Sequence, residues 1–172
     1  MFTKTDAEAY FMAEKQAGLL FLIIGLLAVA GAAYLWWLAK WPWAKGMAIP
    51  LTIIAVLQAV VGYTVHSRAD AQRKNVVYNM DLNPEAIRQQ ELPRMQTVMK
   101  NFTLYKWVEM ILLLTGLGLC LYFRQKPEGQ FWLGVGMGLL LQSCLMLAAD
   151  YFAERRGRNY FTGLSHWARQ PG

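Results

Sequence analysis

The chain has 172 residues, of which 56% are hydrophobic, and its 17 lysine and arginine residues outnumber its 11 aspartate and glutamate residues. This length allows one compact domain, residues 1–172, and the hydrophobic fraction exceeds the roughly 45–50% that is usual for soluble domains. The net charge of +6 is explained by basic segments beside a lipid bilayer, so no nucleic-acid partner is expected.

Long apolar runs predict four transmembrane helices, at about residues 16–39, 46–66, 107–124 and 129–150. About 20 apolar residues cross a bilayer core as a helix, and three of the uncharged runs have that length. The third uncharged run, residues 110–123, is shorter. To span, this run must include residues on its N-terminal side, which draws Glu109 to the edge of the hydrocarbon or into it. We therefore expect an all-α integral membrane protein, a four-helix bundle that runs up-down-up-down.

Lysine and arginine residues are concentrated on one side of the predicted helices. The N-terminus, the helical loop 67–106 and the C-terminal end carry thirteen of them, whereas the two short turns on the other side carry four. Because cytoplasmic segments carry the excess of positive charge, both chain ends are predicted to be cytoplasmic, and the expected location is a bacterial inner membrane. Helices three and four are expected to extend into the cytoplasm.

Local signals predict where several helices begin and end. Thr5 with Glu8 three residues later is typical of a capping box, so a helix is expected from there into the first span. Asn83 and Pro84 predict a helix start within the loop, and Pro93 is expected to end or kink that short helix. Gly157 is expected to stop helix four, which leaves a cytoplasmic tail, residues 157–172.

The two predicted hairpins have polar residues at matching positions. The matching pairs are Gln58 and Gln142, His66 and Asp150, Asp70 and Glu154, Tyr10 and Tyr105, and Glu14 and Glu109. Many membrane folds are built from repeats, so this pattern predicts two duplicated helical hairpins. The alternative is a chance match, because membrane helices share a small set of residue types.

The same polar residues form a candidate ligand or metal site near the cytoplasmic ends of the helices. Residues four apart share a helix face, so inward-turned faces would bring five carboxylates and one imidazole to one level. The carboxylate layer, as we name this set, consists of Glu14, His66, Asp70, Glu109, Asp150 and Glu154. The supporting residues are Tyr10, Tyr105, Gln58 and Gln142. Ionisable groups at membrane depth are costly and usually have a function.

Three uses of the carboxylate layer stay open. In outline it resembles the di-metal carboxylate bundles, which implies a divalent metal, although His-x3-Asp differs from their Glu-x-x-His and one histidine is available. The layer can also carry protons or cations. In a structural role, its acids are neutralised by cations at the same level, namely Lys15, Arg68, Lys106, Arg155 and Arg156.

Small residues indicate where helices approach one another closely. Gly134-x3-Gly138 on helix four, with Gly116 and Gly118 on helix three, permits tight contact within one chain or in a homodimer. Cys120 and Cys144 lie inside predicted spans and form no CxxC pair, so disulfide-exchange chemistry is not expected.

The motif content favours binding over catalysis. The sequence has no phosphate loop, no dinucleotide fingerprint, no HExxH and no GxSxG. The leading hypothesis is a non-enzymatic inner-membrane protein that binds a partner, either an accessory subunit or a toxin-immunity protein. One alternative is a protein that binds a metal or small ligand, including an oxidoreductase. The other is a dimeric transporter of ions or small solutes.

Overall fold

The computed structural model describes residues 2–169, and its regular elements in this range are all helical, as the sequence predicts. Helix α1 spans Lys4–Trp37 and α2 spans Pro42–Leu82. The short helix α3, Pro84–Ala86, leads through a π-helical segment, Ile87–Glu91, into α4, Leu92–Phe123. A 3-10 turn, Pro127–Gly129, precedes α5, Gln130–Arg169.

Four helical stretches of this chain are long and apolar enough to cross a membrane. They are Lys4–Trp37, Pro42–Leu82, Pro84–Phe123 and Pro127–Arg169. The 41 residues of α2 measure roughly 60 Å at 1.5 Å per residue, about twice the ~30 Å thickness of a bilayer core. These helices therefore have room for an apolar span and for an extension of similar length.

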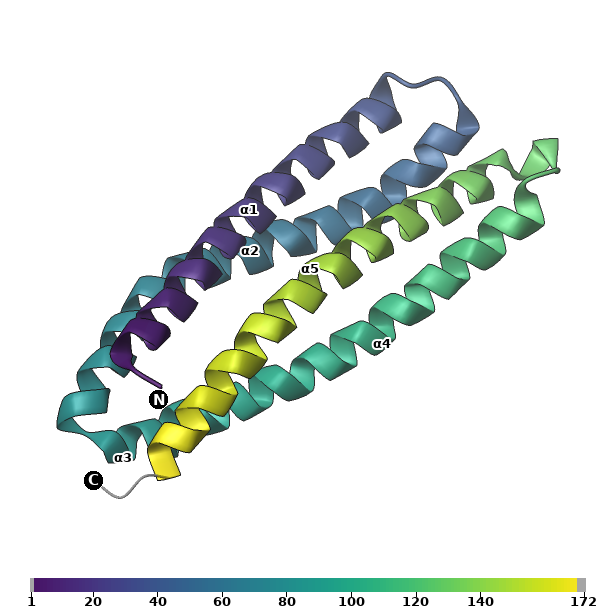
Figure 1. Cartoon of the computed structure of the whole chain (residues 1–172). Helices are drawn as coiled ribbons and strands as arrows, with labels where there is room; N and C mark the ends of the chain where they lie inside the picture. Colours follow the sequence, from purple (N-terminus) through teal and green to yellow (C-terminus); the bar gives the residue numbers. More distant parts are fainter. Residues whose placement is uncertain (1, 170–172) are drawn as a thin grey trace.

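The helices lie side by side in the order α1, α2, α5, α4, with α2 and α5 in the middle (Figure 1). Successive long helices run in opposite directions, so α2 and α5 run parallel to each other (Figure 1). Helices α1 and α4 occupy the two outer positions. The apolar halves of the four helices thus form a layer, and their polar faces do not all meet on one axis.

Glycine residues set the close approach of α2 and α5. A Cβ atom on Gly134 would collide with the main-chain oxygen of Trp43, and one on Gly46 would collide with that of Phe131. A Cβ on Gly138 would lie 2.9 Å from the main-chain oxygen of Met47. The backbones are therefore in direct contact, as in other membrane helix pairs that pack through small residues.

Each hairpin has a contact of the same kind. Within the first, a Cβ on Gly25 would lie 2.9 Å from the main-chain oxygen of Ala55. Within the second, a Cβ on Gly116 would lie 2.9 Å from the main-chain oxygen of Gly136. No other helix among the described residues has an atom within 4 Å of a Cβ placed on Gly118, so Gly118 takes no part in this helix contact.

The main hydrophobic core lies at the end of the molecule that holds both termini (Figure 1). All four long helices contribute to it, and its buried residues are Ala7, Phe11, Val76, Met80, Ile87, Met95, Tyr160 and Leu164. We name this part of the four helices the terminal bundle. It is closed around its own core, unlike the layer of apolar spans.

Helix α5 does not end at Gly157, so the predicted helix stop is wrong. The helix continues to Arg169 because Tyr160, Leu164 and Ala168 are buried along its inner face. Gly157 is buried, and a Cβ there would lie 3.5 Å from the sulfur of Met99 on α4. The packing of α5 on the terminal bundle therefore outweighs the local preference of glycine for a helix end.

The capping box of α1 lies two residues before the predicted one. Thr3 is the cap, and its Oγ1 accepts a hydrogen bond from the main-chain N–H of Asp6 at 3.4 Å. Asp6 Oδ2 accepts from the Thr3 N–H at 2.8 Å. Thr5, the predicted cap, lies inside the helix. A threonine followed three residues later by an acid occurs twice here, as Thr3 with Asp6 and as Thr5 with Glu8, and the first of these pairs begins the helix.

The third long helix starts where the sequence predicts, and a π segment interrupts its regular α geometry before Pro93. The Asn83 side chain accepts a hydrogen bond from Ala86 N at 3.3 Å and caps α3, as predicted. Pro93 was expected to end or kink this helix. The regular α-helix gives way to a wide π turn directly before Pro93, and Pro93 itself lies in the first turn of α4, where a missing N–H is tolerated.

The glycine contacts make a stability prediction. Gly134→Ala should destabilise the protein by about 1–3 kcal/mol, because the added methyl group forces α5 away from α2. Gly118→Ala is the matched control and should be neutral or slightly stabilising, since alanine favours a helix over glycine. Thermal unfolding of both variants in the same detergent measures the difference. Equal midpoints would contradict the proposed role of Gly134.

Candidate functional site

The carboxylate layer is divided between the two hairpins. In the first hairpin, the Lys15 ammonium group on α1 pairs with the Asp70 carboxylate on α2. The hydrogen bond from Lys15 lowers the pKa of Asp70 below its usual value. His66 Nδ1 lies 3.1 Å from the main-chain oxygen of Lys15, so Nδ1 donates in this contact. Lys15 therefore contacts both His66 and Asp70 on α2.

The second hairpin holds a corresponding ion pair. Lys106 Nζ on α4 donates to Glu154 Oε2 on α5 at 2.8 Å, and Arg158 pairs with the other oxygen of Glu154. The hydrogen bond from Lys106 lowers the pKa of Glu154. A lysine on the outer helix thus binds an acid on the central helix in both hairpins.

Glu109 is the most buried acid of the predicted layer, with 5% of its surface exposed. The carboxyl group of Asp150 on α5 is close enough to interact with that of Glu109 on α4. Within residues 2–169, Glu109 Oε2 is buried and has no hydrogen-bond partner. A buried carboxyl oxygen without a hydrogen bond costs stability. A purely structural role therefore accounts less well for Glu109 and Asp150 than for the ion-paired acids of the layer.

Within residues 2–169, one ion pair joins the two hairpins. Arg156 Nη2 on α5 lies 3.3 Å from Glu14 Oε1 on α1. Three of the five cations predicted at this level, Lys15, Lys106 and Arg156, therefore each bind an acid of the layer. Helices α1 and α4 lie at opposite edges, and each brings an acid to α5: Glu14 pairs with Arg156, and Glu109 lies near Asp150.

The layer does not form one cage. Among residues 2–169, no group of three or more His, Cys, Asp and Glu side chains is placed to hold a metal ion. The supporting residues are dispersed as well. Gln58 and Gln142 are each 2% exposed inside the apolar spans, whereas Tyr105 is 49% exposed on α4. Tyr10 lies in the terminal bundle, away from Tyr105.

A second polar cluster, which the sequence analysis did not predict, lies in the terminal bundle. Arg94 donates to both oxygens of Glu91, from Nε at 2.8 Å and from Nη2 at 2.7 Å. The Tyr160 hydroxyl donates to Glu91 Oε1 at 2.9 Å. The Tyr10 ring stacks on that of Tyr160, with centroids 4.1 Å apart. Burial raises the pKa of both tyrosines, so both keep their protons.

A weak sequence signal for this cluster exists. Glu91 and Arg94 are three residues apart, which places them on one face if the segment is helical. The expectation that Pro93 breaks the helix concealed this relation. The partner Tyr160 lies in the segment that was predicted to be a tail, so its burial had no sequence signal.

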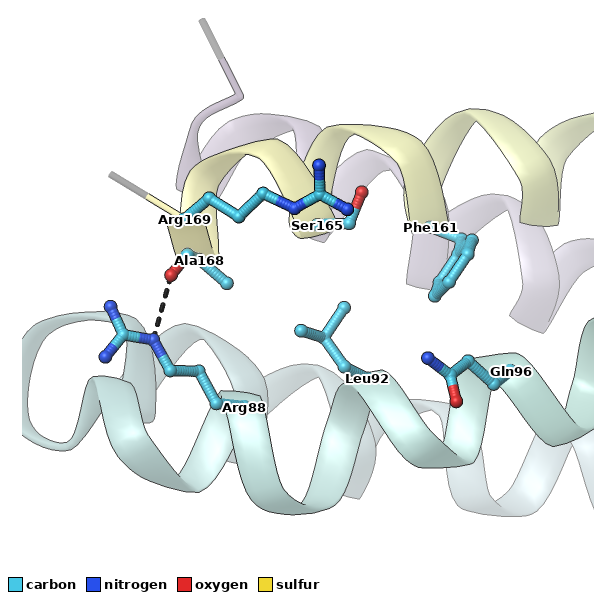
Figure 2. A pocket seen from close by; sticks show the side chains of 7 residues that line it. All are labelled: Arg88, Leu92, Gln96, Phe161, Ser165, Ala168 and Arg169. Atoms are coloured by element: carbon cyan, nitrogen blue, oxygen red, sulfur yellow. Dashed lines mark hydrogen bonds between the residues drawn. The ribbon is translucent and has the colours of Figure 1, made fainter. Parts of the chain in front are cut away.

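Two pockets open beside this cluster. The larger, about 320 Å³, lies between the start of the third long helix and the end of α5 (Figure 2). Leu92 and Phe161 project into it from opposite sides, and Arg88 Nε donates to the main-chain oxygen of Ala168 at 2.8 Å (Figure 2). The smaller, about 180 Å³, is lined by Gln72, Asn75, Val76, Asn79, Ala86, Ile87, Gln90, Glu91 and Arg94.

Comparison of the chain with the models of known protein families, with curated proteins and with solved structures gave no match. A function for this chain must therefore be argued from its own residues. The candidate site consists of the divided carboxylate layer and of the terminal bundle with its buried ion pair and two pockets.

The buried ion pair predicts a large effect of removing one partner. Arg94→Met leaves the Glu91 carboxylate buried without its cation, which should cost roughly 3–5 kcal/mol of stability. Lys4→Met is the control, because the pair of Lys4 with Asp81 is exposed and should contribute about 0–1 kcal/mol. Chemical unfolding in one detergent compares the two variants. If both lose the same small amount, Glu91 and Arg94 are not a buried pair.

Proposed function

We propose that this chain is an integral membrane protein that acts by binding a partner protein through its terminal bundle. The observation that carries the proposal is the continuation of the helices past their apolar spans into a bundle with its own core. Crossing a bilayer requires about 20 residues. In the three longest helical stretches, Pro42–Leu82, Pro84–Phe123 and Pro127–Arg169, roughly half of the residues are therefore not needed for the span. A closed bundle with pockets on its surface provides a rigid binding face.

The location and orientation are part of the proposal. We place the protein in a bacterial inner membrane, with the terminal bundle and both chain ends in the cytoplasm. The support is the distribution of basic residues, since thirteen lie on the side of the terminal bundle and four in the opposite turns. A partner would therefore be cytoplasmic or would have a cytoplasmic part, as for an accessory subunit or an immunity protein.

We also propose that the chain is a duplicated hairpin. The support is the agreement between the two hairpins in space: Lys15 binds Asp70 as Lys106 binds Glu154. The central residues Asp70 and Glu154 are also a matching pair of the sequence comparison. On the outer helices, these contacts make Lys106 the equivalent of Lys15. The sequence pair Tyr10 and Tyr105 gives an alignment of the same helices that differs by about one helical turn.

A binding role agrees with the state of the acids. Glu14, Asp70 and Glu154 are each engaged by a lysine or an arginine. A carboxylate held by a cation is stabilised in its charged form and is less available as a metal ligand or proton acceptor. These three residues are therefore interpreted as structural, and the partner is expected to bind elsewhere, on the terminal bundle.

Site-specific cross-linking tests the partner-binding proposal. A photo-reactive phenylalanine at Tyr78, 64% exposed on the terminal bundle, should give one discrete adduct with a protein in the native host. The same residue at Trp41, 63% exposed in the opposite turn, should not. Glu109→Gln should leave the adduct unchanged. Adducts that are the same from both positions, or none from Tyr78, would contradict the proposal.

Glu109 and Asp150 favour a second candidate function, the passage of protons or cations by a dimer. The specific observation is the buried Glu109 oxygen without a hydrogen-bond partner, close to the carboxyl group of Asp150. Two neighbouring carboxyl groups suit one shared proton or a bound cation.

A flux assay tests this candidate. Vesicles that contain the protein should show a proton or potassium flux, and Glu109→Gln should reduce it at least tenfold. Glu8→Gln, an exposed acid of α1, is the control and should leave the flux unchanged. Wild-type vesicles no more permeable than protein-free ones would exclude this function for these ions.

A further inference from the structure

The smaller pocket of the terminal bundle is lined by carboxamide side chains on both sides. Gln72, Asn75 and Asn79 lie on α2 with spacings of three and four residues, so they share one face of that helix. Gln90 belongs to the π segment on the other side. We name this site the carboxamide pocket. Val76 and Ile87, 2% and 1% exposed, are the buried apolar residues of its lining.

Much of the hydrogen-bonding capacity of these carboxamides is unused. Asn79 Nδ2 donates to Asn75 Oδ1 at 2.9 Å, which holds the two side chains together and leaves the Asn75 NH2 group and the Asn79 oxygen free for other partners. In the part of the chain that the structure describes, the side chains of Gln72 and Gln90 make no hydrogen bond. Each carboxamide offers two donor hydrogens and one acceptor oxygen, and a peptide group offers one of each.

The charge of the pocket argues against an ionic ligand. Glu91 and Arg94 are the charged residues of its lining, and they bind each other at 2.7 Å. Their charges cancel, and both oxygens of Glu91 are already occupied. What the pocket presents to a ligand is therefore a set of neutral donors and acceptors.

The size of the pocket distinguishes between a small molecule and a peptide. Its volume is about 180 Å³, whereas pockets that enclose a cofactor or a drug-sized molecule usually have roughly 300–1,000 Å³. Along α2, Gln72 and Asn79 are seven positions apart, which corresponds to roughly 10 Å at ~1.5 Å per residue. An extended chain covers that distance with about three residues at ~3.3 Å each.

We propose that the carboxamide pocket binds the main chain of an extended segment of the partner protein. In this arrangement the carboxamides of α2 and Gln90 bind peptide N–H and C=O groups from both sides. Side chains of the bound segment that point away from the pocket do not contribute to specificity. The π segment supports this assignment, because wide turns of this kind are frequent at functional sites. The inference rests on the proposed function and names the part of the terminal bundle that performs it.

A peptide selection on the full-length protein in lipid nanodiscs tests this proposal. The probe is a library of capped, random heptapeptides, and the best binder is then studied by titration. The double variant Asn75→Ala/Asn79→Ala should weaken its binding about tenfold or more, since two or more hydrogen bonds are lost. Methylation of the central backbone nitrogens of the peptide should have a similar effect. Gln96→Ala, in the other pocket, is the matched control and should change the affinity less than about twofold.

Selection of no peptide, or of peptides that are indifferent to the double variant and to methylation, would overturn the proposal. Binding of free glutamine or urea with the same dependence on Asn75 and Asn79, without any peptide binding, would identify a small-molecule site instead. The adduct formed from position 78 in the native host separates this result from the proposed function. If that adduct persists in the double variant, partner binding stands and the carboxamide pocket is not its site.

Discussion

The contact between α2 and α5 determines how the rest of the molecule is arranged. Within a bilayer, helices gain little from the hydrophobic effect, so their association depends on close van der Waals contact. Gly46, Gly134 and Gly138 allow the two backbones to touch, and this contact joins the hairpins in parallel. With α2 and α5 central, α1 and α4 occupy the outer positions. The carboxylate layer accordingly has one ion-paired group in each hairpin, and the pair of Arg156 with Glu14 joins the two groups.

Features that depend on local composition were predictable from the sequence. The four apolar runs correspond to four long helices. Asn83 caps the short helix α3 at the predicted position, and Gly134 and Gly138 lie in a helix contact. Features that depend on the rotation of each helix were not. The spacing of Glu14, His66 and their equivalents shows that they share faces, but their partners depend on which helices are neighbours. That information resides in glycine contacts between segments about 90 residues apart in the chain, such as Gly134 with Trp43.

Tertiary packing overrides the helix-stop signal of Gly157, which lies within α5 in the terminal bundle. Pro93 predicts an end or a kink, and the regular α-helix gives way to the π segment directly before it. At Gly157 the small residue allows α5 to approach Met99 on α4. At Pro93 the π segment accommodates the chain just before the proline, and the same wide turn ends with Glu91 buried in the core. The cluster of Glu91, Arg94 and Tyr160 was not predictable from local signals, because it forms only if the helix continues past Pro93 and α5 continues past Gly157.

The buried pair of Glu91 and Arg94 connects the fold to the proposed function. Burial of two charges is costly, and their mutual attraction rarely makes such a pair better than an apolar substitute of the same volume. The Glu91–Arg94 pair acts here mainly by fixing the position of the π segment. Three hydrogen bonds hold Glu91 to Arg94 and Tyr160, so the π segment is fixed against α5 while its neighbour Gln90 stays at the surface beside α2. A pocket wall that is held in this way loses little entropy on binding, and uncharged donors and acceptors suit a peptide main chain better than a reacting substrate.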